Sequence, residues 1–228
     1  MIRTINKLKL DQITQAIPPL PNGWLNGFDA AVLYTIARSL DHSDSILEVG
    51  SWIGRSSCVI AHALESVSDR KIRFDIVDFG IAGSREWEWR FGSSVYKEKD
   101  ADSHLSVIMK AGGSGAVLKQ NLIERDLARF VSLIVLGDIR DYESTRKYDF
   151  IFCDATHSPD EIRRNIPVIS SRLSSEFILA CDDIVNADDA EIIKSIVGAD
   201  FFYLTNSSDQ YSKLGVFIKG LRFSGLLT

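Results

Sequence analysis

The sequence predicts an α/β fold in which helices cover both faces of a mostly parallel β-sheet. Five short apolar runs alternate with segments of helical periodicity. These runs are continuous rather than alternating, which is typical of parallel strands buried on both faces. Two more apolar runs near the end of the chain are joined by a polar loop without a long helix, and this pattern predicts a hairpin. We therefore expect seven strands, the last two antiparallel.

The expected strands are short apolar segments at residues 45–50, 73–78, 131–136, 148–154, 176–183, 201–204 and 214–219. The expected helices have apolar residues at helical spacing and lie at residues 28–40, 55–67, 116–129, 159–173 and 188–197. Strand–helix alternation of this kind favours a Rossmann-like sheet between two layers of helices.

The length of 228 residues suits one domain with an insertion. We divide the chain into an N-terminal arm at 1–25, an α/β domain at 26–220 and a tail at 221–228. Residues 79–115 form an irregular, aromatic-rich insertion that ends in several glycines. Long insertions in compact domains are often lids or binding segments. A surface excursion whose aromatic residues attach it to the core is the alternative.

The composition excludes several classes of protein. The chain is 45% hydrophobic and 25% charged, as in globular proteins, and its three cysteines form no disulfide or zinc pattern. We expect reduced cysteines in a cytoplasmic protein. A net charge of −5 with scattered basic residues argues against a nucleic-acid partner. The sequence has no apolar run long enough for a membrane span and no signal-peptide core, so we expect no membrane partner.

A glycine loop follows the first expected strand and opens a helix. Gly50 permits a tight turn, and Gly54 allows the backbone to approach a ligand. Trp52 stands where a dinucleotide fingerprint has its middle glycine, so a pyrophosphate would be obstructed and a nicotinamide-dependent dehydrogenase is disfavoured. S-adenosylmethionine has no phosphate, and the E-x-G-x-x-x-G pattern resembles the first motif of class I methyltransferases. The cofactor-binding residues expected in this loop are Glu48, Gly50, Ser51, Gly54 and Ser56.

Two acids follow the next strands. Asp78 ends the second strand, and an acid there accepts hydrogen bonds from both hydroxyls of a ribose. Asp138 follows the third strand, and the resemblance to class I methyltransferases implies that it lies beside the adenine.

The fourth strand leads into a predicted helix start. Ser158 suits an N-cap, Pro159 the first helical position, and Glu161 completes a capping box. His157 and Asp154 are therefore left at the carboxyl end of the strand. In open α/β sheets, ligands bind at this edge.

The fifth strand ends at the same edge with Asp182 and Asp183, which brings three carboxylates together with Asp154. Acids this close repel one another unless a cation joins them, and carboxylate oxygens suit Mg²⁺ or another divalent cation. We therefore expect a metal held by Asp154, Asp182 and Asp183. Such an ion lowers the pKa of a bound hydroxyl, and His157 can remove the proton as general base.

These motifs and the seven-strand count resemble the class I S-adenosylmethionine-dependent methyltransferases. Asp-x-x-His after the fourth strand and paired acids after the fifth look like the metal-dependent macrocin-type sugar O-methyltransferases and the similar cephalosporin hydroxylase-like group. The resemblance spans residues 27–219 and implies catalytic roles for His157 and Asp154. The paired acids are Asp-Asp where the macrolide enzymes have Glu-Asp, and a Pro-Gly-Gly turn is missing before the fifth strand.

The sequence therefore predicts an S-adenosylmethionine-dependent O-methyltransferase that uses Mg²⁺ and acts on a small molecule such as a sugar or another natural product. Two alternatives stay open: a metal-independent methyltransferase of another acceptor, and a module that binds S-adenosylmethionine without turnover. The insertion would then be the lid or the acceptor-binding segment. We also expect a homo-oligomer, with the arm and the insertion as interface elements.

Overall fold

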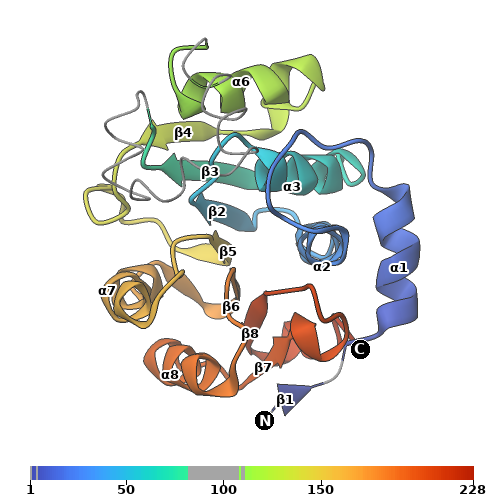
Figure 1. The fold of residues 1–228 in the computed structure, drawn as a ribbon, viewed down its shortest axis with the longest axis vertical. Helices are drawn as coiled ribbons and strands as arrows, with labels where there is room; N and C mark the ends of the chain where they lie inside the picture. Colours follow the sequence, from blue (N-terminus) through green and yellow to red (C-terminus); the bar gives the residue numbers. More distant parts are fainter. Residues whose placement is uncertain (1, 4, 82–107, 109–110) are drawn as a thin grey trace.

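The protein is described by a computed structural model over residues 2–3, 5–81, 108 and 111–228. Within those residues the strands are β1 (Ile2–Arg3), β2 (Ser45–Val49), β3 (Arg73–Asp78), β4 (Leu133–Leu136), β5 (Tyr148–Cys153), β6 (Leu173–Cys181), β7 (Phe201–Leu204) and β8 (Gly215–Lys219). They form one sheet in the order β1-β7-β8-β6-β5-β2-β3-β4 (Figure 1). All paired strands are parallel, except that β8 is antiparallel to β6 and β7.

The predicted fold class is confirmed: β2 to β8 are the seven expected strands, and the last two form the antiparallel pair. An eighth strand, β1, was not expected. It lies in the N-terminal arm and pairs with β7. Strand β6 begins at Leu173, before the start predicted at residue 176. Its pairing with β5 continues past an irregularity between Tyr148 and Phe150, so Leu173, predicted as the last residue of a helix, belongs to the sheet.

The helices are α1 (Lys7–Ala16), α2 (Gly27–Arg38), α3 (Arg55–Glu65), α6 (Ser114–Glu124), α7 (Pro159–Ser170) and α8 (Ala187–Val197). One buried cluster joins α2, α3 and α6 to one face of the sheet, and a second joins α7 and α8 to the other face. Helix α1 packs on the outside of α2. None of the described helices combines the length and apolarity needed to cross a membrane.

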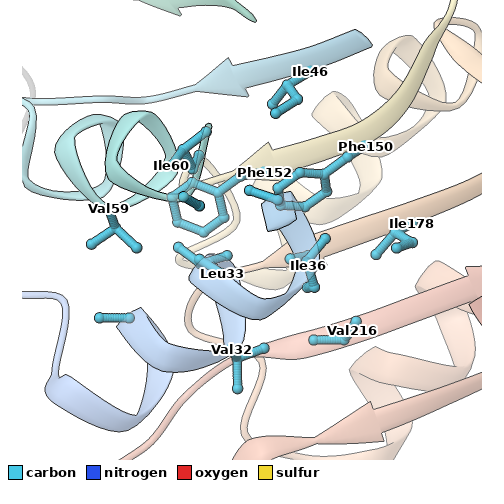
Figure 2. Packing of buried hydrophobic residues seen from close by; sticks show 14 of the residues in the cluster. Val32, Leu33, Ile36, Ile46, Val59, Ile60, Phe150, Phe152, Ile178 and Val216 are labelled. Carbon is cyan, nitrogen blue, oxygen red and sulfur yellow. The ribbon is translucent and has the colours of Figure 1, made fainter. Parts of the chain in front are cut away.

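The larger core lies between α2, α3 and the middle of the sheet (Figure 2). Leu33 and Ile36 of α2 point toward Phe150 and Phe152 of β5. All of these side chains are at most 1% exposed. Burying apolar surface of this kind is the main stabilising term in folding. It holds the central strands in register, so their carboxyl ends lie at one edge.

Hydrogen-bonded caps set where the helices begin at that edge. Ser158 caps α7 by accepting from the Glu161 N–H at 3.3 Å, and Pro159 is the first helical residue, as predicted. Asn26 caps α2 in the same way, accepting from the Asp29 N–H at 2.8 Å. The loops after β5 and before α2 are thereby fixed close to the strand ends.

Most of the predicted insertion at 79–115 lies outside the described residues, which end at Ile81 and resume fully at Ala111. Its two ends meet. The Ser114 N–H donates to the Ile81 carbonyl at 2.7 Å, and the Ile81 N–H donates to Ser114 Oγ at 2.9 Å. The segment therefore leaves and re-enters the domain at one point beside β3.

Candidate active site

A cavity of about 460 Å³ opens at the carboxyl ends of the central strands. Seven of the residues predicted for the site line it, namely Gly50, Asp78, Asp138, Asp154, His157, Asp182 and Asp183. Ser51 and Ser56 line a smaller hollow that shares Trp24, Trp52 and Asp154 with the main cavity. The location matches the rule that open α/β sheets bind ligands at this edge.

The glycine loop brings the ends of β2 and β5 into close contact at Gly50. This residue has a φ of +85°, and a Cβ placed on it would lie 2.4 Å from the backbone oxygen of Asp154. The Gly50 N–H donates to the Val77 carbonyl at 2.9 Å, and the Asp154 N–H donates to the Val49 carbonyl at 2.8 Å. Only glycine fits here, because both the conformation and the space exclude a side chain.

Glu48 lies beneath the loop rather than in the cavity. Its carboxylate is fully buried and accepts hydrogen bonds from Ser56 and Ser57 at the start of α3. Burial raises the pKa of Glu48 to about 7. Glu48 and Ser56 therefore join β2 to α3 and give the loop its shape, and neither lines the main cavity.

Asp78 connects the two loops that flank the end of β3. Its Oδ2 accepts from the Trp52 N–H and its Oδ1 from the Gly80 N–H, both at 2.8 Å. Each carboxylate oxygen has a second lone pair. The carboxylate can therefore still accept hydrogen bonds from a ribose at the cavity.

Asp138 is held by its neighbour Arg140. The Arg140 Nε lies 2.9 Å from Asp138 Oδ1, and Nη2 lies 2.6 Å from Oδ2. Because of these bonds the pKa of Asp138 is lowered to about 2. Both residues line the cavity, so a ligand that contacts this carboxylate must share it with the guanidinium.

The other predicted residues meet at the ends of β5 and β6. The pairing of Cys153 with Cys181 places Asp154 beside Asp182, and the Asp182 N–H donates to the Cys153 carbonyl at 2.9 Å. Thr156 Oγ1 donates to the Asp182 carbonyl at 2.8 Å, which ties the two loops together.

His157 faces the acids through one ring nitrogen. Its Nδ1 lies 3.3 Å from Asp183 Oδ2 and 3.8 Å from Asp154 Oδ1. Asp183 raises the pKa of His157, and in return the pKa of Asp183 is lowered to about 2, first by His157. The imidazole is 45% exposed, so its other side is open toward the cavity.

Lys213 contributes a cation that the sequence analysis did not predict. It belongs to the loop before β8, and its Nζ lies 3.0 Å from Asp183 Oδ1. Both oxygens of Asp183 therefore face basic groups. Among the described residues no basic group lies as close to Asp154 or Asp182. Their pKa values are raised, by burial first and then by the neighbouring Asp182 and Asp183 respectively.

The side chains as arranged do not fit the predicted metal. Lys213 and His157 already lie against the two oxygens of Asp183, so a divalent ion bound there would have to sit beside the Lys213 ammonium. Over the described residues, no group of three or more His, Cys, Asp and Glu side chains is arranged to hold a metal ion.

The N-terminal segment supplies another wall that the sequence did not reveal. Arg55, the first residue of α3, donates to the carbonyls of Leu25 and Pro21, each at 2.7 Å. This holds Trp24 against Trp52, with ring centroids 5.5 Å apart and planes at 30°. No local motif marks these residues, because their place depends on contacts between distant segments.

The strand order, the glycine loop and the acid at the end of β3 together define the class I methyltransferase architecture. Residues 47–184 match the methyltransferase domain family. This span covers more than half of the 228 residues, so the chain belongs to that family and is an S-adenosylmethionine-dependent methyltransferase.

Solved structures agree with the fold. A methyltransferase from Geobacter sulfurreducens superposes with a TM-score of 0.51 at 14% identity, covering 96% of this chain and 100% of that one. A candidate O-methyltransferase from Nostoc punctiforme PCC 73102 gives 0.53 at 13% identity, covering 96% of this chain and 63% of that one. No curated protein matches the sequence.

Replacing Gly50 with alanine should destabilise the protein and weaken cofactor binding, because the new Cβ would collide with the Asp154 backbone. We expect a loss of about 2 kcal/mol or more in the free energy of unfolding, measured with urea. Gly112→Ala is the matched control, since Gly112 also has a positive φ of +87° but no atom of the described residues lies within 4 Å of the point that its Cβ would occupy. Equal losses in the two variants would contradict the role of this contact.

The buried Glu48 should make stability fall as the pH rises. Its pKa is about 7 in the folded chain against 4.5 when unperturbed, so between these pH values the native state keeps a proton that the unfolded state has lost. Glu48→Gln should therefore gain stability relative to wild type from pH 4.5 to pH 8, by on the order of 3 kcal/mol. Glu191→Gln on the exposed surface should show no such trend in the same urea titrations. If the difference in the free energy of unfolding between Glu48→Gln and wild type does not change with pH, this account is contradicted.

Proposed function

We propose that the protein transfers the methyl group of S-adenosylmethionine to a hydroxyl oxygen of a small-molecule acceptor, with His157 as general base. The contact between His157 and Asp183, 3.3 Å apart at the cavity, is the observation that carries this proposal. When bound, S-adenosylmethionine supplies a methyl group on a positively charged sulfur. The tasks left to the protein are to orient the two reactants and to remove a proton.

The cofactor contacts we propose follow the order of the strands. Asp78 at the end of β3 would accept hydrogen bonds from the ribose hydroxyls, and Asp138 after β4 would lie toward the adenine. The reacting end would then lie at Gly50 and Asp154, where the close approach of β2 and β5 leaves no side chain in the way.

His157 would act as the base in its neutral form, which becomes populated as the pH approaches 9 because Asp183 raises the pKa of His157 to about 9. Asp183 accepts a hydrogen bond from Nδ1–H, which leaves the Nε2 lone pair free for the acceptor. The proton of the hydroxyl passes to Nε2 as its oxygen bonds to the methyl carbon and the sulfur–methyl bond breaks. The products are the methyl ether and S-adenosylhomocysteine. Asp154, 3.8 Å from Nδ1, would stabilise the imidazolium that forms.

The acceptor we propose is a small ring-shaped molecule, such as a sugar or another natural product. Trp24, Trp52 and Tyr211 line the cavity, and aromatic faces suit a ring with apolar surfaces. The likeness to macrocin-type enzymes and the Nostoc neighbour described as a candidate O-methyltransferase agree with a hydroxyl acceptor. The net charge of −5 disfavours nucleic acid. No step of this reaction is assigned to a metal.

Asp78→Asn should weaken binding of S-adenosylhomocysteine, because a neutral amide cannot accept as well from two hydroxyls while also bonding the loop N–H groups. We expect roughly a tenfold rise in Kd or more by isothermal titration. Asp160→Asn, on a side chain that is 97% exposed, is the control and should bind as wild type does. An unchanged Kd in Asp78→Asn would remove Asp78 from the cofactor site.

His157→Ala should reduce turnover and leave the affinity for S-adenosylhomocysteine unchanged. The rate should fall by about 10²–10⁴-fold, the usual contribution of a general base. Turnover is followed as release of S-adenosylhomocysteine with a panel of hydroxylated acceptors. His42→Ala is the control, because His42 does not line the cavity and its Nδ1 accepts from the Lys71 N–H. Full turnover in His157→Ala would exclude it as the base.

A further inference from the structure

We infer that Lys213 is the resident cation of the acid cluster, so that its ammonium group takes the place a divalent metal would otherwise occupy. This inference rests on the proposed function, since it assigns the charge balance of the same site. The three acids follow β5 and β6, and the lysine lies in the hairpin loop before β8.

A positive charge stabilises the acid cluster whenever its carboxylates are ionised. Asp154, Asp182 and Asp183 all line the same end of the cavity, and the paired strands β5 and β6 hold the first two side by side. Like charges at this separation repel strongly when they are partly shielded from water. A cation at this point removes that repulsion, and either a metal ion or a lysine can supply it.

Lys213 lies in position to do so. Its Nζ is 3.0 Å from Asp183 Oδ1, and its side chain is 56% exposed on the wall of the cavity. Asp182 and Asp154 also act on it electrostatically. A divalent ion bound by the same three acids would lie next to this ammonium, and the two positive charges would compete for Asp183.

The backbone of Lys213 is fixed on both sides, which distinguishes it from a mobile surface lysine. Its N–H donates to Asp29 Oδ2 at 3.0 Å, and its carbonyl accepts from the Ile184 N–H at 2.8 Å. Ile184 directly follows the acid pair, so Lys213 is joined to this segment by a backbone hydrogen bond to Ile184 and by the ion pair with Asp183.

A second contact fixes the same loop to α2. Asn26 Nδ2 donates to the Tyr211 carbonyl at 2.8 Å, while Asn26 also caps the helix that carries Asp29. Isolated surface ion pairs contribute little because their side chains must be ordered. Here the anchored backbone has already reduced that entropic cost, so the ion pair can hold Asp183 against His157.

The test is binding of Mn²⁺ to the full-length protein, saturated with S-adenosylhomocysteine, with free Mn²⁺ measured by electron paramagnetic resonance. We expect weak binding to wild type and roughly tenfold or greater tightening in Lys213→Ala, because the competing charge is gone. Lys194→Ala, which removes a lysine paired with Glu191 away from the cavity, should bind as wild type does. Lys213→Ala with Asp183→Asn should lose the acquired binding, which places the ion at Asp183.

Two outcomes overturn the inference: wild type that binds Mn²⁺ as tightly as Lys213→Ala, or a Lys213→Ala protein that binds no better than wild type. Thermal melting and the affinity for S-adenosylhomocysteine show that each variant is folded. Lys213→Met, which keeps the apolar stem, replaces alanine if that variant unfolds. Failure to bind S-adenosylhomocysteine would instead contradict the proposed function, so the two failures are distinguishable.

Discussion

The contact between Gly50 and the backbone of Asp154 is the constraint on which the site depends. It brings the ends of β2 and β5 so close that any side chain at Gly50 would overlap the Asp154 carbonyl. The glycine loop can then turn toward Asp78, whose carboxylate accepts the Trp52 N–H. The same approach places Asp154 at the opposite side of the loop. One backbone contact therefore separates the end of the cavity proposed for the nucleoside from the end that carries the proposed chemistry.

Electrostatics organise that second end. Asp183 is the most strongly paired of its acids, with Lys213 on one oxygen and His157 on the other. Asp154 and Asp182 carry raised pKa values because they are buried beside like charges. A histidine oriented by a carboxylate is a common arrangement for a general base. In this protein the orienting carboxylate is itself fixed by a lysine whose backbone is anchored to α2 and to the loop after β6.

Much of this could be predicted from local sequence. Continuous apolar runs revealed the seven strands, and the residues that follow them, such as Asp154 and Asp182, had to meet at one edge because parallel strands end together. Lys213 and Trp24 could not be predicted. Each reaches the cavity through contacts with distant segments, Asp29 for Lys213 and Arg55 for the loop of Trp24. Glu48 matched a cofactor motif, yet it lies buried below the loop, since a sequence pattern does not reveal which way a side chain points from a strand.

The most direct test of the account is a crystal structure of the protein with S-adenosylhomocysteine. We predict the nucleoside in the cavity at the strand ends, with the ribose hydroxyls within hydrogen-bond distance of Asp78 and the sulfur facing His157. A nucleoside bound elsewhere, or a sulfur directed away from His157 and Asp154, would contradict the arrangement on which the proposed methyl transfer rests.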